Sequence, residues 1–458
     1  MFAHNNATWK KYFAYSSINF GFSLLGMTVA TLLMYYYTDV LMLPAVAVSV
    51  ILFSARLFDG VVDPFLGHYM DKRSTKLGKY RGYVIYCGPL ACITFLLLFA
   101  GAPFTPFMGI ARIVWCLLLY LAFTLAFSFI EVASLPMLAS FETREKRSTA
   151  NTLKIAACIA ATLLAVIFSA KLVQLFGSRS EQSGYARMAA AFAFVAFVSL
   201  LFGGFGFRED HYANTSAEET TGTLDTKRAI ATVLRERSIF FLLSMYLCVD
   251  AAAAFKMQAG IYYLKYNLAR PELTGLFLGS SIVVSLLAQP LVLLCSHRFE
   301  VRTLMVYGCF ISAAAMLLIG LSGSSVTMII AFNCVYGLAS AFPANLVFSH
   351  MVDLSDQLGK KEGKPYGGVV NAFIGLASRV GASLASALLS LILFATAYVP
   401  NQTQSGKTLL GIAVGFVALP VATLLLGGGC AAWSFRGIRG MEPRPEPSAE
   451  FFSSEAEV

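Results

Sequence analysis

The chain is a succession of long apolar segments separated by short polar stretches, and many segments run to about 20 residues or more. That is the length a helix needs to cross the hydrocarbon core of a bilayer. A transmembrane β-barrel is excluded, because its strands show short segments of alternating polarity and these runs are continuous. The pattern therefore predicts an all-α membrane protein with twelve transmembrane helices. The expected spans are residues 12–37, 44–70, 83–101, 110–140, 151–176, 187–207, 238–266, 273–296, 303–322, 325–351, 367–396 and 408–435.

Composition and charge placement agree with this pattern. The mean hydropathy is +0.70, which excludes a soluble protein. The net charge of +9 does not indicate a nucleic-acid partner, because the basic residues lie in short loops after spans two, four and ten. Basic loops stay on the cytoplasmic side, so we expect a multi-pass plasma-membrane protein (inner membrane in a bacterium) with both termini cytoplasmic. These basic residues are Lys72, Arg73, Lys76, Lys79, Arg81, Arg144, Lys146, Arg147, Lys360, Lys361 and Lys364.

The longest polar interruption falls after span six and divides the chain into two halves of six spans each. The halves resemble each other weakly, since span one ends with Tyr35–Asp39 and span seven with Tyr262–Tyr266, two runs rich in tyrosine. Two parallel six-helix bundles are the layout of the major facilitator superfamily. The predicted parts are an amino-terminal bundle with a cation site (1–207), a central cytoplasmic loop (208–237), a carboxy-terminal bundle (238–435) and a disordered cytoplasmic tail (436–458).

Two carboxylates lie in span two, where charge is costly. Asp59 and Asp63 are four residues apart, so a helix places them on one face. A charged side chain at the bilayer centre costs about 2.5–3.5 kcal/mol even on lenient scales, so the pair should face protein or a water-filled cavity. The pair predicts a binding site for a cation or a proton. If the coupling ion is sodium or lithium, Asp59 and Asp63 are metal ligands. The alternative is a structural pair in which Arg56, one turn earlier, neutralises Asp59.

Other polar residues within the spans have two interpretations each. Glu131 in span four is expected either to pair with Lys154 of span five or to contact a substrate. Asp250 and Lys256 of span seven contact substrate or pair with another helix. Asn19 hydrogen-bonds either a substrate or a neighbouring helix.

The loop after span two is a candidate gating element, although its charges can also serve topology alone. Its candidate residues are Asp71, Arg73 and Arg81. The chain has no phosphate-binding loop with the required Lys-Ser/Thr, no nucleophile–base set and no metal-ligand spacing. The cysteines are scattered within spans. We therefore expect neither enzyme activity nor a cofactor.

Three sequence segments resemble the glycoside–pentoside–hexuronide:cation symporters, the family of the melibiose permease within the major facilitator superfamily. The resemblance extends over nearly the whole chain. Its segments are Met34–Val40 at the end of span one, Asp59-x-x-x-Asp63-Pro64-x-x-Gly67 followed by Lys76–Arg81, and Tyr398-x-x-Asn401-Gln402-x-Gln404 between the last two spans.

The resemblance implies that Asp59 and Asp63 bind the coupling sodium, lithium or proton. Val62 stands where the family often has an Asn, which favours protons or a sodium site completed elsewhere. At the family's sugar-binding positions, Ser23 and Phe129 replace carboxylates. Positive charge remains at two further positions of the family, Lys154 on helix five and Arg379 on helix eleven.

The predicted function is a secondary active symporter that works by alternating access, with H⁺ or Na⁺ as its coupling ion. Its partners are the lipid bilayer and a small polar organic solute, by family a sugar, glycoside or sugar acid. We expect it to function as a monomer. Two alternatives stay open: a cation-coupled transporter of an amphiphile such as a lysophospholipid, and a non-transporting sensor on a transporter fold.

Overall fold

The computed structural model describes residues 2–100, 109–141, 144–177, 180–209, 232–233, 235–323, 325–362 and 367–434, and helices dominate throughout these residues. Most of the predicted central loop and the whole predicted tail lie outside the described residues. The amino-terminal half contains α1 (Phe2–Tyr35), η1 (Tyr36–Val40), α2 (Ala45–Lys72), α3 (Arg81–Ala100), α4 (Ile110–Met137), η2 (Leu138–Ser140), α5 (Arg144–Leu163), η3 (Leu164–Phe168), α6 (Ser169–Phe176) and α7 (Glu181–Gly206). The carboxy-terminal half contains α10 (Arg237–Tyr262), η5 (Tyr263–Asn267), η6 (Pro271–Leu273), α11 (Thr274–Leu287), α12 (Gln289–Arg298), α13 (Val301–Leu321), α14 (Val326–Glu362), α15 (Gly367–Ala395), α16 (Gly406–Ala413), η7 (Val414–Ala418) and α17 (Leu419–Ser434).

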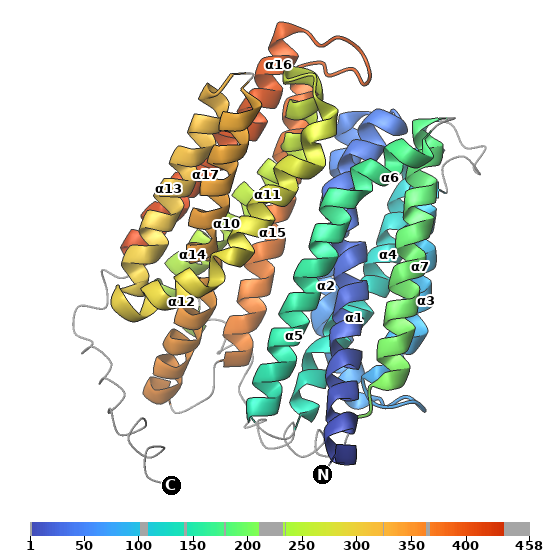
Figure 1. The fold of residues 1–458 in the computed structure, drawn as a ribbon, viewed down its shortest axis with the longest axis vertical. Coiled ribbons are helices and arrows are strands. Elements are labelled where there is room, and N and C mark those ends of the chain that lie inside the picture. The colour runs from blue at the N-terminus through green and yellow to red at the C-terminus, as the bar shows by residue number, and fades with distance from the viewer. Residues whose placement is uncertain are drawn as a thin grey trace.

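These helices form the twelve predicted spans, arranged as two bundles side by side (Figure 1). Ten helices of the described part are long and apolar enough to cross a membrane by themselves. The eighth span is bent by 40° between Leu287 and Gln289. Pro290 follows this break, and a proline ring removes one helical hydrogen bond and clashes with the preceding turn. The remaining span is α2, which holds the charged residues that matter most for the site.

Contacts between the two halves include two seams, in addition to the contact of α1 with α10. On one seam α2 packs against α15, and on the other α11 packs against η3 and α6. Gly275 and Gly279 make the second approach possible, because an added Cβ would lie 2.9 Å from the Ile167 carbonyl oxygen and 2.5 Å from the Ile167 Cγ1, respectively. Small residues let helix backbones come close inside a membrane, where packing drives association.

The tyrosine-rich ends of spans one and seven adopt the same unusual geometry. Both η1 and η5 are π-helical turns, and each follows directly on a long helix. Such turns are rare and occur frequently at functional sites. The weak repeat between the halves therefore extends to local backbone structure.

The candidate gating loop is fixed at one end by a carboxylate from beyond α7. Glu209 accepts hydrogen bonds from the backbone N–H groups of Lys79, Tyr80 and Arg81, at 2.5, 2.8 and 2.5 Å. These groups lie at the amino-terminal end of α3, where helix N–H groups have no partner within the helix and the macrodipole favours negative charge. Glu209 thus ties the start of the central connection to this loop.

Replacing Glu209 with Ala is expected to lower the free energy of unfolding by about 1.5–3 kcal/mol, the range for hydrogen bonds to charged groups. Hydrogen–deuterium exchange of the amides of residues 79–81 should accelerate, because three donors lose their acceptor. Arg208→Ala is the matched control, since its side chain is exposed. Unchanged exchange at these amides in Glu209→Ala would contradict the anchoring role.

Candidate functional site

A single guanidinium joins carboxylates from two helices of the opposite half. Arg379 of α15 directs Nη2 at Oε2 of Glu131, at 3.0 Å, and Nε at Oδ2 of Asp59, at 3.7 Å. Its Nη1 donates a hydrogen bond to Oδ2 of Asp63. A guanidinium presents its donors as a planar fork, so one side chain can address several carboxylates at once. The seam between α2 and α15 therefore contains three negative charges around one positive charge.

The four side chains differ in exposure and in their remaining partners. Asp59 is 7% exposed and accepts a 2.5 Å hydrogen bond from Ser128 on α4, which fixes its orientation. Asp63 is 15% exposed, and its Oδ1 atom is buried without a hydrogen-bond partner in the described part of the chain. Glu131 is 34% exposed and is thus the most accessible carboxylate of the three. A buried carboxylate oxygen without a donor is costly, so Asp63 is a natural point for a proton or a cation.

The sequence predicts these carboxylates as candidates, with other partners for two of them. Among the described side chains Asp59 forms an ion pair with Arg379, whereas the sequence spacing pairs it with Arg56, whose side chain lies outside the described part. Glu131 pairs with the same arginine, and not with Lys154. Among the described residues, no group of three or more His, Cys, Asp or Glu side chains has the arrangement of a metal site. In this conformation the carboxylates surround the guanidinium.

A second polar cluster, centred on Asp39, joins the two halves at the ends of spans one and seven. Asp39 is fully buried, and its Oδ1 accepts hydrogen bonds from Lys265, Tyr266 and Tyr398, at 3.2, 2.5 and 2.7 Å. Its Oδ2 accepts a 2.8 Å hydrogen bond from Thr38. Burial and the Asp39 carboxylate raise the pKa of the Tyr398 hydroxyl well above its ordinary value, so Tyr398 remains a donor.

Lys265 of the carboxy-terminal half forms an ion pair with Asp39 of the amino-terminal half. Its ammonium donates to the Tyr35 hydroxyl at 2.5 Å, to Asp39 at 3.2 Å and to the Asn401 side-chain oxygen at 2.7 Å, which matches its three donors. Asn401 in turn donates to the Asp39 carbonyl at 2.9 Å. We call Thr38, Asp39, Lys265, Tyr266, Tyr398 and Asn401 the Asp39 cluster. The sequence contained a signal for it, because the two tyrosine runs of the repeat include Asp39 in one half and Lys265 in the other.

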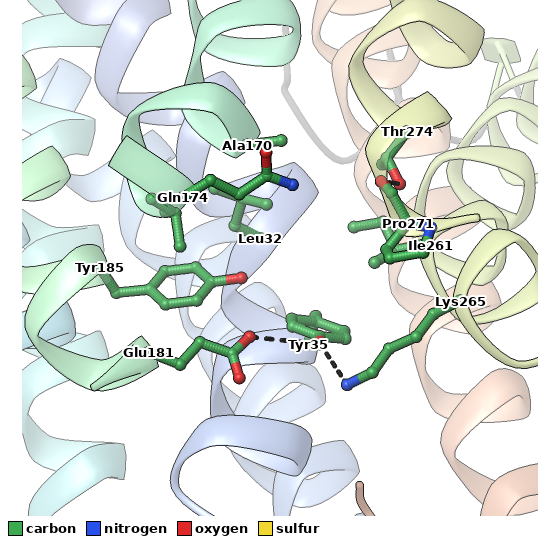
Figure 2. A pocket seen from close by; sticks show the side chains of 11 residues that line it. Leu32, Tyr35, Ala170, Gln174, Glu181, Tyr185, Ile261, Lys265, Pro271 and Thr274 are labelled. Atoms are coloured by element: carbon green, nitrogen blue, oxygen red, sulfur yellow. Dashed lines mark hydrogen bonds between the residues drawn. The ribbon is translucent and has the colours of Figure 1, made fainter. Parts of the chain in front are cut away.

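A pocket of about 100 Å³ lies beside this cluster, with walls from both halves (Figure 2). Tyr35 stands between Glu181 of the amino-terminal half and Lys265 of the carboxy-terminal half, and hydrogen-bonds both. The Tyr185 ring and Thr274 line opposite sides. The pocket is small beside typical ligand pockets, which have volumes of about 300–1,000 Å³. It borders the junction of the halves and lies away from the Arg379 carboxylates.

The candidates of span seven are enclosed by the carboxy-terminal bundle. Lys256 is 4% exposed; it donates to Ser281 at 2.7 Å, and its ammonium lies 4.1 Å from the centre of the Tyr336 ring. No ion pair involves Lys256 among the described side chains. Asp250 lies near the hydroxyl groups of Tyr246, on its own helix, and of Ser378, the neighbour of Arg379. Asp250 therefore lies where α10 meets α15, while Lys256 packs against α11 and α14.

The remaining predicted residues do not join either cluster. Asn19 is buried and donates within its own helix to the Tyr15 carbonyl at 2.9 Å. Ser23 and Lys154 are half-buried and have no hydrogen bond or ion pair in the described part of the chain. Arg73, directly after the end of α2, is exposed and lies over the Tyr69 ring of that helix. The Asp71 side chain lies outside the described part, and the Arg81 backbone binds Glu209.

Comparisons with known proteins agree with this architecture. Residues 14–433 match the profile of the family described as "MFS/sugar transport protein". The chain is 25% identical over 423 residues to the isoprimeverose transporter of Lactiplantibacillus pentosus, covering 91% of this chain and 86% of the relative. It is 23% identical over 432 residues to the glucuronide carrier protein homolog of Escherichia coli K12, covering 92% and 91%.

The fold is also that of a solved transporter. The crystal structure of the nucleoside transporter NupG superposes with a TM-score of 0.66 at 13% identity, covering 93% of this chain and 99% of that one. Identity at this level supports the fold alone. The family match covers both helical bundles and both polar clusters. The chain therefore belongs to the MFS/sugar transport protein family, as a multi-pass membrane transporter of the glycoside–pentoside–hexuronide type and not an enzyme.

Proposed function

We propose that the protein is a cation-coupled symporter of a sugar or sugar derivative that works by alternating access. The observation that carries the proposal is the group formed by Asp59, Asp63 and Glu131 around Arg379. Its formal charge is −2, from three carboxylates and one guanidinium. Excess negative charge is costly in a low-dielectric seam, so the group favours partial neutralisation, which protons or sodium ions can supply.

Coupling follows from thermodynamic linkage. A cation that binds the carboxylates and favours one arrangement of α2 against α15 also changes solute affinity in that arrangement, and the solute changes cation affinity by the same factor. The hydrogen bonds and the ion pair of the Asp39 cluster hold the two halves together at another part of their junction. With both termini cytoplasmic, as the basic loops predict, this cluster lies on the outer side, so the conformation is closed outward.

A sugar-type solute is favoured by the relatives, whose names include an isoprimeverose transporter, a glucuronide carrier homolog and a raffinose carrier. Glu131 and Arg379 offer the acceptors and donors that sugar hydroxyls need, and Arg379 can also pair with an acidic sugar. Lys256 is enclosed and is thus less suited to direct contact with solute in this conformation.

The test needs no known solute. Purified wild-type protein and Asp59→Asn are melted in sodium, lithium or potassium chloride at several pH values. A ligand specific to the folded state stabilises it by about 2.7 kcal/mol at a hundredfold excess over Kd. We expect a sodium-, lithium- or proton-dependent rise in Tm that Asp59→Asn abolishes. Equal Tm values in all salts and no difference in pH response between the two proteins would overturn the proposed coupling.

A further inference from the structure

The guanidinium of Arg379 has a separate nitrogen for each of its three carboxylates. Nε faces Asp59, Nη1 faces Asp63 and Nη2 faces Glu131. The first two carboxylates belong to α2, and Glu131 belongs to α4. Arg379 therefore contacts two different helices, and the nitrogen that faces Glu131 is not shared with either aspartate.

A coupling cation at Asp59 and Asp63 competes with this arginine. Arg379 faces Oδ2 of both aspartates, and Oδ1 of Asp59 already accepts from Ser128, so a cation that bridges the pair draws on the same oxygens as the guanidinium. A sodium ion or proton taken up there weakens the hold of both aspartates on Arg379. An arginine in a largely buried seam cannot lose its proton, so it needs another anionic partner when the aspartates are neutralised.

We propose that Glu131 is this partner: a positioning residue that retains Arg379 when the coupling cation occupies Asp59 and Asp63. The inference rests on the cation site of the proposed function. Glu131 makes a 3.0 Å contact that can persist without moving the guanidinium far, whereas the Asp59 contact is already 3.7 Å. Release of the aspartates then requires a small rotation of one side chain, and no charge is left unpaired.

An arginine suits position 379 better than a lysine in this role. A lysine ammonium is a compact point charge, while the guanidinium fork can remain bound through Nη2 after Nε and Nη1 are released. The 34% exposure of Glu131 leaves it open enough to follow Arg379 as the seam rearranges. Glu131 acts on the cation through the arginine, so its effect should depend on Arg379 being present.

A double-mutant cycle in cation binding tests this dependence. Wild type, Glu131→Gln, Arg379→Gln and the double variant are titrated with sodium chloride at pH 8, and Tm is measured at each concentration. If the protein is coupled to protons, Tm is instead measured against pH in choline chloride, and the pH midpoint of the stabilisation is compared. Glu131→Gln should weaken sodium binding about tenfold, or lower the pH midpoint by about one unit, because Arg379 stays on the aspartates. Arg379→Gln should strengthen binding, and adding Glu131→Gln to it should change little.

Each other outcome decides against the proposal. An equal effect of Glu131→Gln with and without Arg379 means that Glu131 acts on the cation directly. Normal cation binding in Glu131→Gln means that Arg379 needs no such partner. Glu181→Gln, which removes a carboxylate beside the Asp39 cluster, controls for a general loss of negative charge, and Glu131→Asp should recover part of the affinity. If the wild type responds to no cation, the proposed function itself is overturned, and this result differs from every result that contradicts the role of Glu131 alone.

Discussion

Replacing Arg379 with Gln is expected to destabilise the protein by about 3 kcal/mol at pH 8 without sodium or lithium, the scale found when one partner of a buried ion pair is removed. Asp59, Asp63 and Glu131 would then repel one another without a positive charge between them. Protons bound by the folded protein relieve this repulsion, so the folded state binds more protons than the unfolded chain. Stability of the variant should therefore fall as pH rises and recover on acidification.

The comparison is made by thermal or denaturant unfolding of wild type and Arg379→Gln between pH 5 and pH 8. The difference between the two proteins should shrink towards pH 5. Arg379→Lys is the matched control, because it keeps the charge and loses the fork, and it should fall between the two. A pH-independent difference would mean that Arg379 contributes by packing against α2, and not by holding the carboxylates.

Asp39→Asn should loosen the junction of the halves at the Asp39 cluster. The substitution keeps the shape of the side chain, but it removes the buried charge that Lys265 requires and replaces one acceptor oxygen by a donor. We expect a loss of about 3 kcal/mol in stability, by the same reasoning about an unpaired charge. Amides of η1 and η5 should exchange hydrogen faster, because the hydrogen bonds between these turns maintain the closure.

Hydrogen–deuterium exchange followed by mass spectrometry measures this directly, with α13 as an internal reference distant from the cluster. Glu181→Gln is the control. Glu181 lies at the same end of the molecule, but its carboxylate is exposed and accepts only a 3.4 Å hydrogen bond from Tyr35. This substitution should leave exchange in η5 nearly unchanged. If both variants behave alike, the closure does not depend on the Asp39–Lys265 pair.

Much of the fold could be predicted because a membrane imposes strong local constraints. Length and continuity of the apolar runs determined the spans, since each helix must satisfy its own backbone hydrogen bonds in lipid. The eighth span was predicted as one segment from 273 to 296, and the structure bends it by 40° before Pro290. Proline marked that position in the sequence, but packing decided the angle.

The candidate site divides in the same way. Four-residue spacing within one helix predicted that Asp59 and Asp63 share a face, and the cost of intramembrane charge marked them as functional candidates. Their partner could not be found by spacing, because Arg379 lies 316 positions from Asp63. The family resemblance placed a positive charge at Arg379 without assigning Glu131 to it.

The sequence by itself determined the membrane class, the twelve spans, the repeat of two halves and the carboxylate pair in span two. Each of these follows from local periodicity or from the free energy of placing a charge in lipid. Only the tertiary structure decided which distant charges meet: Arg379 with three carboxylates at the α2–α15 seam, and Asp39 with Lys265 where the ends of spans one and seven meet. The physical reason is that a charge within a membrane must be compensated, but any oppositely charged side chain that packing brings within reach can compensate it.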